Sequence, residues 1–329
     1  MDEKRDVIQR KESFFGARRA AFLLILDYIN SIFYNKNMRK ISVAGYGFLE
    51  RMNTEEAFSL LSKVGFDAID YPLYGFGHCI DFEIEGGDSL ARAKDIRRIA
   101  AEHGVVVGQT HAPFGFREEH KNDVEAILDV YRRAAEATAL LGAKHMVVHP
   151  LKFNDCIFDY RREECFDLNV EIFRRLTPIL KETGVVALLE NMFVTEHGDG
   201  WFRLLPTIYS SGEELARAKD ILGDSYGVCL DSGHAFITKE DIPETVRRIG
   251  KRLVALHLHD NTGDRDDHLP PYFGKMPMDE LISALKKVGY DGNLNFEVRF
   301  EAVPADFLET AMKYVYDVGV KFRRILDGE

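Results

Sequence analysis

Two histidines follow a short apolar run near residue 257, and further metal-ligand side chains come within about ten residues of them. The run Leu253–Leu256 leads into His257 and His259, which point to the same side if the strand continues, and Asp266 and His268 follow in the next loop. An unpaired ionisable group is costly inside a buried strand, so we expect the cluster at a strand end. Structural, hydrogen-bonded histidines are the alternative. Because histidine and carboxylate together suit Zn²⁺ or Mn²⁺, the residues favour a metal site.

Side chains of the same kinds end other short apolar segments of the chain. They are His111, His149, Glu190, Asp231 with His234 three residues later, and Glu297. Each has a structural explanation when taken alone, because polar residues at strand ends often cap helices or bond loops. Together with the segment that ends in His257, six consecutive apolar segments end in a side chain that can bind a metal. Chance placement explains this poorly, because a fold that gathers the strand ends would place these side chains together.

Glu190 and Glu297 each follow an apolar segment, so their carboxylates are expected to emerge from dry strands into a shared opening. Two carboxylates held by one cation can act both as ligands and as proton carriers. A pair of rim residues in ion pairs, for instance with Arg299, is the alternative. We also place Arg299, His111 and His149 among the expected substrate contacts.

The elements that must position these residues repeat one unit: an amphipathic helix, a glycine, a short apolar strand and a polar residue. A glycine just past a helix permits the left-handed turn that ends it, and Asn53–Glu56 reads as a capping arrangement for the first helix. The eight expected strands lie near residues 41–46, 67–71, 105–110, 144–149, 185–190, 227–231, 253–257 and 293–297. Eight alternating units predict an α/β fold, a (β/α)₈ TIM barrel with its site at the carboxyl ends of the strands; a doubly wound open sheet is the runner-up.

Length and charge restrict the choice of partner. The 329 residues include 43 Lys and Arg against 54 Asp and Glu, a net charge of −11, which disfavours nucleic acid. Four scattered cysteines form no CxxC pair, which favours a reduced, cytoplasmic protein. The apolar stretch Ala20–Leu26 is too short to span a membrane. It also does not read as a secretory signal peptide, because Asp27 interrupts its apolar end and no small-residue cleavage site follows. We expect a small-molecule sugar or polyol substrate and no membrane partner, and leave a homo-oligomer open.

Residues 1–37 differ from the rest of the chain in their charged start and in the mixed aromatic and aliphatic spacing of Phe14–Tyr34. We interpret them as an N-terminal helical extension of uncertain status, because Met38 is also a plausible start. Residues 38–329 are predicted to form a single barrel domain.

The chain from about Met38 onward resembles the xylose isomerase-like TIM barrels, the sugar phosphate isomerase/epimerase group that includes endonuclease IV. The stretches that carry the resemblance are Leu189–Asn191, Leu230–His234, His257–Asn261, Asp267–Pro271 and Asn295–Val298. Their combination is specific for the superfamily but not for a substrate. Family members usually have Gly-x-Gly after the two prolines, where this chain reads Tyr272–Lys275. This departure concerns substrate contacts of that loop and not the metal ligands.

The resemblance implies one divalent cation (Mn²⁺, Zn²⁺, Mg²⁺ or Co²⁺) held by four side chains, as in the epimerases of the group. The implied ligands are Glu190, Asp231, His257 and Glu297. His234 resembles the residue that contacts a substrate oxygen. Endonuclease IV-like enzymes hold three zinc ions, and further residues of this chain resemble their extra ligands. These possible additional ligands are His111, His149, His234, Asp266 and His268.

These observations predict a divalent-metal-dependent isomerase or epimerase of a sugar or sugar phosphate. The glutamates Glu190 and Glu297 would transfer a proton through an enediolate that the metal stabilises. One alternative is an endonuclease IV-like zinc phosphodiesterase acting on abasic DNA, although the acid-rich segments Asn261–Asp267 and Glu196–Asp199 oppose a basic groove. A second alternative is a sugar-binding barrel without turnover, because fold alone does not fix function.

Overall fold

From Lys40 onward, parallel strands alternate with helices along the described chain. The computed structural model describes residues 38–74, 89–114, 123–151 and 161–328. The strands of the main sheet are β1 (Ile41–Ala44), β2 (Ala68–Pro72), β3 (Val106–His111), β4 (His145–Val148), β5 (Val186–Glu190), β8 (Tyr226–Asp231), β9 (Leu253–His257) and β10 (Leu294–Phe296). The helices are α2 (Thr54–Val64), α3 (Ser89–Glu102), α4 (Val124–Leu141), α5 (Arg162–Thr183), α6 (Gly212–Leu222), α7 (Ser232–Ile237), α8 (Ile242–Ile249), α9 (Met278–Val288) and α10 (Ala305–Asp327).

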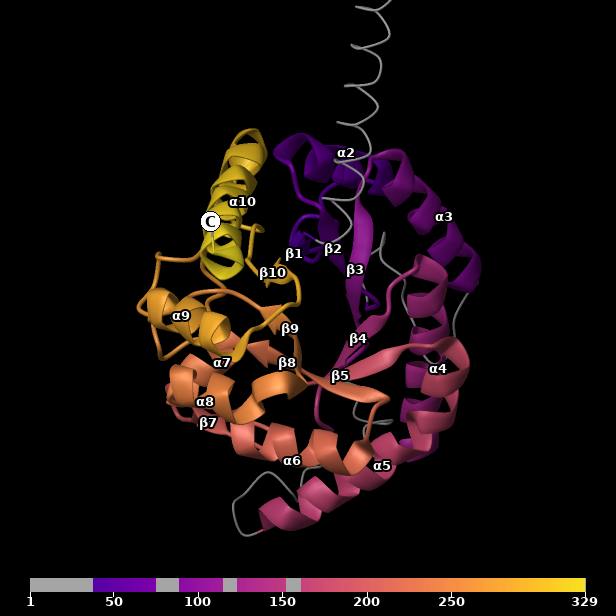
Figure 1. The fold of residues 1–329 in the computed structure, drawn as a ribbon, viewed down its shortest axis with the longest axis vertical. Helices are drawn as coiled ribbons and strands as arrows, with labels where there is room; N and C mark the ends of the chain where they lie inside the picture. Colours follow the sequence, from indigo (N-terminus) through magenta and orange to yellow (C-terminus); the bar gives the residue numbers. More distant parts are fainter. Residues whose placement is uncertain (1–37, 75–88, 115–122, 152–160, 329) are drawn as a thin grey trace, which may run out of the picture. The chain divides into compact units, whose positions relative to one another are not determined.

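The sheet is a parallel barrel, as the sequence predicts. The strands follow the order β10-β1-β2-β3-β4-β5-β8-β9, and every neighbouring pair is parallel. A parallel bridge between Leu258 and Phe296 joins the two ends, with the Leu258 amide 2.8 Å from the Asn295 carbonyl. Figure 1 looks down this barrel, with the helices arranged around the strands. The (β/α)₈ fold is therefore confirmed and the open sheet is excluded.

Helix ends follow the expected chemistry. Asn53 caps α2: its side chain accepts a 2.9 Å hydrogen bond from the Glu56 amide, and the Glu56 carboxylate accepts one of 3.1 Å in return. Gly65 ends the same helix with φ at 111°, a conformation that side chains rarely tolerate. Helix α6 ends at Leu222 with Gly223 as its cap, whereas Gly227, near the start of the strand expected at 227–231, lies inside β8. A Cβ at Gly227 would come within 2.7 Å of Val254, so glycine serves close packing there.

Two elements were not predicted. An antiparallel hairpin, β6 (Phe193–Gly198) with β7 (Trp201–Pro206), follows β5 and contains the residues expected to form an acid-rich loop. The short helix α7 begins directly after Asp231, whose side chain caps it. Both follow a strand that ends in an expected ligand, so they form part of the rim of the barrel.

The predicted extension, residues 1–37, lies outside the described residues. Its helical character and the domain boundary at residue 38 therefore stay predictions. Among the described helices, none combines the length and the apolar character needed to cross a bilayer.

Candidate active site

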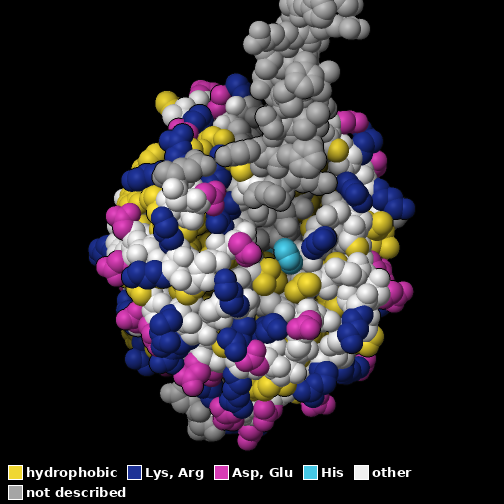
Figure 2. All heavy atoms as spheres, viewed as in Figure 1, with side chains coloured by type: hydrophobic (Ala, Val, Ile, Leu, Met, Phe, Trp, Pro, Cys, Tyr) yellow, Lys and Arg dark blue, Asp and Glu magenta, His cyan; other side chains and the backbone are white. Residues whose placement is uncertain are grey.

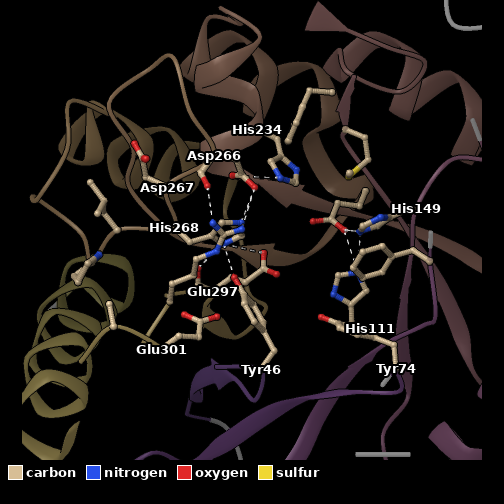
Figure 3. Close-up of a pocket in the computed structure, with 18 of the residues that line it drawn as sticks. Tyr46, Tyr74, His111, His149, His234, Asp266, Asp267, His268, Glu297 and Glu301 are labelled. Carbon is tan, nitrogen blue, oxygen red and sulfur yellow. Dashed lines mark hydrogen bonds and ion pairs between the residues drawn. The ribbon is translucent and has the colours of Figure 1, made fainter. Parts of the chain in front are cut away.

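A cavity of about 800 Å³ opens where the carboxyl ends of the barrel strands converge. Its lining includes Tyr46, Tyr74, His111, Phe114, His149, Glu190, Met192, Phe193, His234, Asp266, His268, Glu297, Arg299 and Glu301. In Figure 3, Tyr46, His268 and Glu297 lie on one side of this cavity and His111 and His149 on the other. The barrel thus gathers the strand-end residues as expected, and their contacts divide them into three adjoining groups.

The central group consists of Glu190, Asp231, His257 and Glu297, from strands β5, β8 and β9 and the residue after β10. One ligand atom from each lies within 4.8 Å of the others, and all four side chains are buried. The His257 Nδ1 atom is 2.6 Å from the Glu190 Oε1 atom and 3.2 Å from the Glu297 Oε2 atom. Both glutamates therefore approach the same nitrogen. Glu190 comes from β5, which neighbours β8, and Glu297 follows β10, which lies beyond β9 on the other side of the pair β8–β9.

Electrostatics keep Glu190 ionised. Burial favours its neutral form, but the neighbouring imidazoles of His257 and His149 outweigh burial and hold the pKa of Glu190 well below its usual range. Burial also opposes charge on His257, yet Cys229, the carboxylates of Glu190 and Glu297 and the hydrogen bond to Asp70 raise the pKa of His257 well above the usual value. Glu190 is therefore ionised at neutral pH, which is the state that a proton acceptor requires.

A second group joins His111 and His149 to Glu190. The two histidine Nε2 atoms lie 2.8 Å apart, and the His149 Nε2 atom is 2.9 Å from the Glu190 Oε2 atom. Burial, followed by the charge on His149, lowers the pKa of His111 to about 4. Phe114 stacks on His149 with the ring centroids 4.4 Å apart. Glu190 thus presents one oxygen to His257 and the other to this pair.

A third group contains His234, Asp266 and His268, together with His259. Asp266 lies between two histidines: its Oδ2 atom is 2.8 Å from the His268 Nε2 atom, and its Oδ1 atom is 3.7 Å from the His234 Nε2 atom. Burial opposes charge on His234, but Asp231 and Asp266 raise its pKa to about 10. The pKa of Asp266 is lowered in spite of burial, mainly by His234 and then by His268. Figure 3 shows Asp266 between these two rings.

His259 joins a different group from His257. Strand β9 ends at His257, so the two side chains do not continue the alternation of a strand. The His259 ring donates from Nε2 to Asp231, at 3.0 Å from Oδ1 and 3.1 Å from Oδ2, and stacks on His268 with centroids 4.0 Å apart. Its ring occupies space left by Gly233, where a Cβ would lie 2.0 Å from the His259 Cε1 atom.

The alternative in which Arg299 pairs with the glutamates is not what the structure shows. The Arg299 side chain contacts Asp266, through a 3.2 Å hydrogen bond to its carbonyl oxygen and a 3.9 Å approach to its carboxylate. Asp267, the next residue, bonds Thr262 in its own loop. Arg299 still lines the cavity, as expected for a substrate contact.

Sequence reasoning missed several residues that position or line the site. Asp70 and Gln109 contact His257 inside the barrel, and the Asn191 side chain bonds the backbone of Asp231. Tyr46 and Tyr74 line the cavity, and the Tyr46 hydroxyl is 2.9 Å from the His268 Nδ1 atom. One signal was available: Asp70 and Gln109 are polar residues within apolar strands. Gln109 also precedes His111 by two positions and so shares its side of β3.

The central donor set fits a divalent cation. Three buried carboxylates surround a single imidazole, so negative charge exceeds what His257 can balance. Buried charges of this kind are stable when paired or bound to metal. A mixed set of carboxylate oxygens and an imidazole nitrogen suits Zn²⁺, Mn²⁺ or Co²⁺ and also accommodates Mg²⁺.

Comparisons with known proteins agree with this architecture. A family model described as xylose isomerase-like TIM barrel matches residues 58–318. The uncharacterised protein y4fM of Sinorhizobium fredii is 27% identical over 258 residues, 68% of this chain and 77% of that protein. The inosose isomerase of Bacillus subtilis is 24% identical over 218 residues, which cover 63% of this chain and 74% of that enzyme.

Solved structures show the same fold. The IolI protein, in a crystal structure with a bound zinc atom, superposes with a TM-score of 0.66 at 22% identity, covering 86% of this chain and 99% of that one. A D-psicose 3-epimerase, solved in the presence of D-fructose, gives 0.65 at 16% identity, covering 88% of this chain and 100% of that one. At these identities the likeness establishes the fold alone.

Proposed function

This chain belongs to the xylose isomerase-like TIM barrel family, and from that membership and the geometry of its pocket we propose that it is a divalent-metal-dependent isomerase or epimerase of a sugar or sugar phosphate. Its relatives of known activity and its structural neighbours include sugar isomerases and epimerases. The contacts within the cavity support the assignment of the metal ligands, the proton carriers and the substrate-binding residues.

One observation carries the proposal: two glutamates from distant strands meet at one imidazole nitrogen. Glu190 and Glu297 lie 2.6 Å and 3.2 Å from the His257 Nδ1 atom, with Asp231 in the same buried group. We assign these four side chains as the ligands of one divalent cation. When bound, such a cation supplies Lewis-acid polarisation of a substrate oxygen, which makes the adjacent C–H group more acidic.

The glutamates carry the proton. Glu190, held ionised by its histidine neighbours, accepts the proton from the carbon next to the substrate carbonyl. Glu297 enters the step protonated and donates its proton to the enediolate that results; Glu190 then releases a proton to solvent and Glu297 takes one up. Because the two side chains come from separate strands, they can serve opposite faces of the substrate carbon, which is the requirement for epimerisation.

Other residues of the cavity are assigned to substrate binding. His234, whose Nδ1–H donates to the Asn191 carbonyl at 2.9 Å, keeps Nε2 directed toward Asp266 and the cavity, where it can contact a substrate oxygen. Arg299, His111 and His149 line the same space. The aromatic wall formed by Tyr74 and Phe114, with ring centroids 4.7 Å apart, offers an apolar surface to the carbon skeleton.

The test is a metal analysis followed by an activity assay. The full chain is purified, its bound metal is measured, and a panel of free and phosphorylated ketoses is assayed with and without that metal in deuterium oxide. Turnover that requires the metal and places deuterium in the product supports the proposal. A chain that binds sugar with no turnover on any ketose would support the non-catalytic barrel instead.

A second candidate function is favoured by a specific observation, the two histidine groups on either side of the central one. His111 and His149 share Glu190 with the central group, and Asp266 and His268 adjoin it through His259 and Asp231. Asp70, His111 and His257 form a further set of this kind, and several adjoining sets of metal-ligand side chains suit a zinc phosphodiesterase, in which several ions neutralise phosphate. One bound ion per chain supports the isomerase, and three support the phosphodiesterase.

A further inference from the structure

The floor of the barrel, directly beneath the central group, has two chemically different halves. Strands β4, β5, β8 and β9 contribute a small apolar cluster of Val147, Leu188, Cys229 and Ala255. Strands β10, β1, β2 and β3 contribute buried polar side chains in its place: Asn295, Ser42, Asp70 and Gln109. TIM-barrel interiors are normally filled by branched apolar side chains, so a polar half requires a reason.

The polar half is organised around one oxygen atom. The Asp70 Oδ2 atom accepts hydrogen bonds from the Gln109 Nε2 atom at 2.8 Å, the His257 Nε2 atom at 2.9 Å and the Asn295 Nδ2 atom at 3.2 Å. Asp70 is only 2% exposed, so a carboxylate there needs several donors. The Gln109 and Asn295 amide nitrogens can only donate, and the Gln109 Nε2 atom also lies 3.1 Å from the His257 Nε2 atom, so the Asp70 oxygen is the acceptor in this cluster.

The donors of this network connect to the site through the strands that carry them. Gln109 lies two residues before His111, and Asn295 lies two residues before Glu297. Since alternate residues of a strand share one side, each amide lies beneath a site residue. His257 belongs to both layers: Nε2 faces Asp70 below, and Nδ1 faces Glu190 and Glu297 above.

We propose that Asp70 is a positioning residue that fixes the ring orientation and tautomer of His257, so that the Nδ1 lone pair is presented to the metal centre. This inference rests on the proposed metal centre and adds a residue to it. An imidazole can bind a cation through Nδ1 only when the remaining proton is on Nε2, and Asp70 is the acceptor that holds that proton. The carboxylate also makes the imidazole a stronger donor to a cation.

The structure offers a matched control in the same layer. Ser42 is 1% exposed and neighbours Asn295 in the β1–β10 register, yet the three bonds to the Asp70 Oδ2 atom do not involve it. Ser42→Ala therefore changes a buried polar side chain of the floor without removing the acceptor of His257. Asp70→Asn keeps the size of the side chain but removes its charge and replaces one acceptor oxygen with an NH₂ donor. Asp70→Ala removes the acceptor completely.

The experiment measures binding of Zn²⁺ or Co²⁺ to the full chain by calorimetry. Both Asp70 variants should bind the metal at least about tenfold more weakly than the wild type, up to about 100-fold, the range for losing such an outer partner. Ser42→Ala should stay within about threefold. In the metal-loaded, ¹⁵N-histidine-labelled protein, the hydrogen-bonded Nε2 proton of His257 should be observed in the wild type and in Ser42→Ala but not in Asp70→Ala.

The outcomes separate this inference from the proposed function. Weaker binding in the Asp70 variants supports the positioning role whether or not the wild type turns over a ketose. Wild-type affinity in both variants, or an equal loss in Ser42→Ala, would show that the floor only packs and would overturn it. If Asp70→Ala does not fold, Asp70→Asn decides. A wild type that binds neither metal would overturn the inference and the metal centre together.

Discussion

Glu190 and Glu297 are the residues on which the proposed proton transfer depends. Replacing either by glutamine keeps the size of the side chain and removes its ability to exchange a proton. Glu190→Gln and Glu297→Gln should each lower turnover on the active ketose by at least about 100-fold, the lower edge for a positioned acid or base. Steady-state kinetics measure the loss, and mass spectrometry measures solvent deuterium in the product.

Glu301 provides the control for this prediction. It points into the same cavity and belongs to none of the three groups of ligand-type side chains (Figure 3). Glu301→Gln should change turnover by less than about tenfold, well short of a lost acid or base. If product never acquires deuterium from solvent, proton transfer is wrong and a hydride shift would replace it.

Asp231 and His257 are proposed to bind the metal ion, and substitutions at these two residues test that assignment. Asp231→Asn and His257→Ala should each remove the bound ion and with it the stabilisation that an ion bound only by the folded state provides, about 2.7 kcal/mol at a concentration 100 times Kd. Elemental analysis and thermal unfolding in metal-replete buffer measure both effects. Asp267→Asn is the control, because Asp267 bonds Thr262 in its own loop. Unchanged metal content in both ligand variants would remove these residues from the site.

The histidines predict a pH dependence for the metal-free protein. The pKa of His234 is raised to about 10 against about 6.5 when unfolded, so its stabilising contribution is complete below pH 6.5 and is lost as pH rises through 10. The raised pKa values of His257 and His268 act in the same direction. His111 has its pKa lowered to about 4 and acts oppositely, losing stability as pH falls from 6.5 to 4.

Together, the contributions of these four histidines to the unfolding free energy of the metal-free chain are largest near pH 6.5. Urea unfolding in chelator should show stability falling between pH 7 and 9. Metal affinity should rise over the same interval, because a cation must displace protons from these imidazoles. A metal-free stability that rises from pH 7 to 9 would contradict the assigned protonation states.

Among the elements, strand β8 and helix α7 meet at a closely packed junction within the site. Asp231 ends the strand and caps the helix through a 2.6 Å bond from the His234 amide. Gly233, inside that first turn, leaves room for the His259 ring that bonds Asp231. The strand end, the helix cap and two of the three groups therefore depend on one glycine.

Gly233→Ala tests this dependence. The added methyl would lie 2.0 Å from the His259 Cε1 atom, so the ring must move away from Asp231. We expect a loss of about 1–3 kcal/mol in unfolding free energy from overpacking and a weaker metal affinity in addition. Asn53→Ala is the control, because losing the α2 cap costs about 0.5–2 kcal/mol without touching the site. If Gly233→Ala and Asn53→Ala bind the metal equally well, the packing of α7 does not influence the metal centre.

At the scale of the molecule, charge decides between the two candidate functions. The chain carries a net charge of −11, and on the face shown in Figure 2 basic and acidic side chains are interspersed over its described part. On the described rim, Arg299 contacts Asp266 and Arg265 lies over Phe202 with its guanidinium carbon 5.7 Å from the ring centre. This distribution opposes a continuous grip on a phosphate backbone.

We therefore expect no salt-dependent binding to duplex DNA that contains an abasic site, and no strand cleavage with excess Zn²⁺. A protein with six or more phosphate contacts loses about 10³-fold in affinity between 50 and 200 mM salt, so fluorescence anisotropy over that range is a sharp test. Cleavage that His111→Ala or His149→Ala abolishes would reverse the order of the two functions.

The barrel and the residue types of the site could be predicted from the order and spacing of residues along the chain. Eight apolar strands with glycine-terminated helices between them can bury their surfaces in few ways, and strands of one direction bring their carboxyl ends to one edge. For that reason His111, Glu190, Asp231, His257 and Glu297 were predictable as neighbours. Their common position at the carboxyl ends of apolar strands is a local property that can be read from spacing along the chain.

The grouping of these residues could not be predicted in this way, because it follows from contacts between strands that lie far apart in the chain. Contacts such as His257 with Asp70, 187 positions away, or His259 with Asp231 depend on barrel closure and on ring rotation, which no local pattern encodes. The same holds for Arg299, whose side chain contacts Asp266 and not the glutamates. Spacing along the chain fixes which edge of the sheet a side chain reaches, whereas packing between strands fixes which neighbour it touches there.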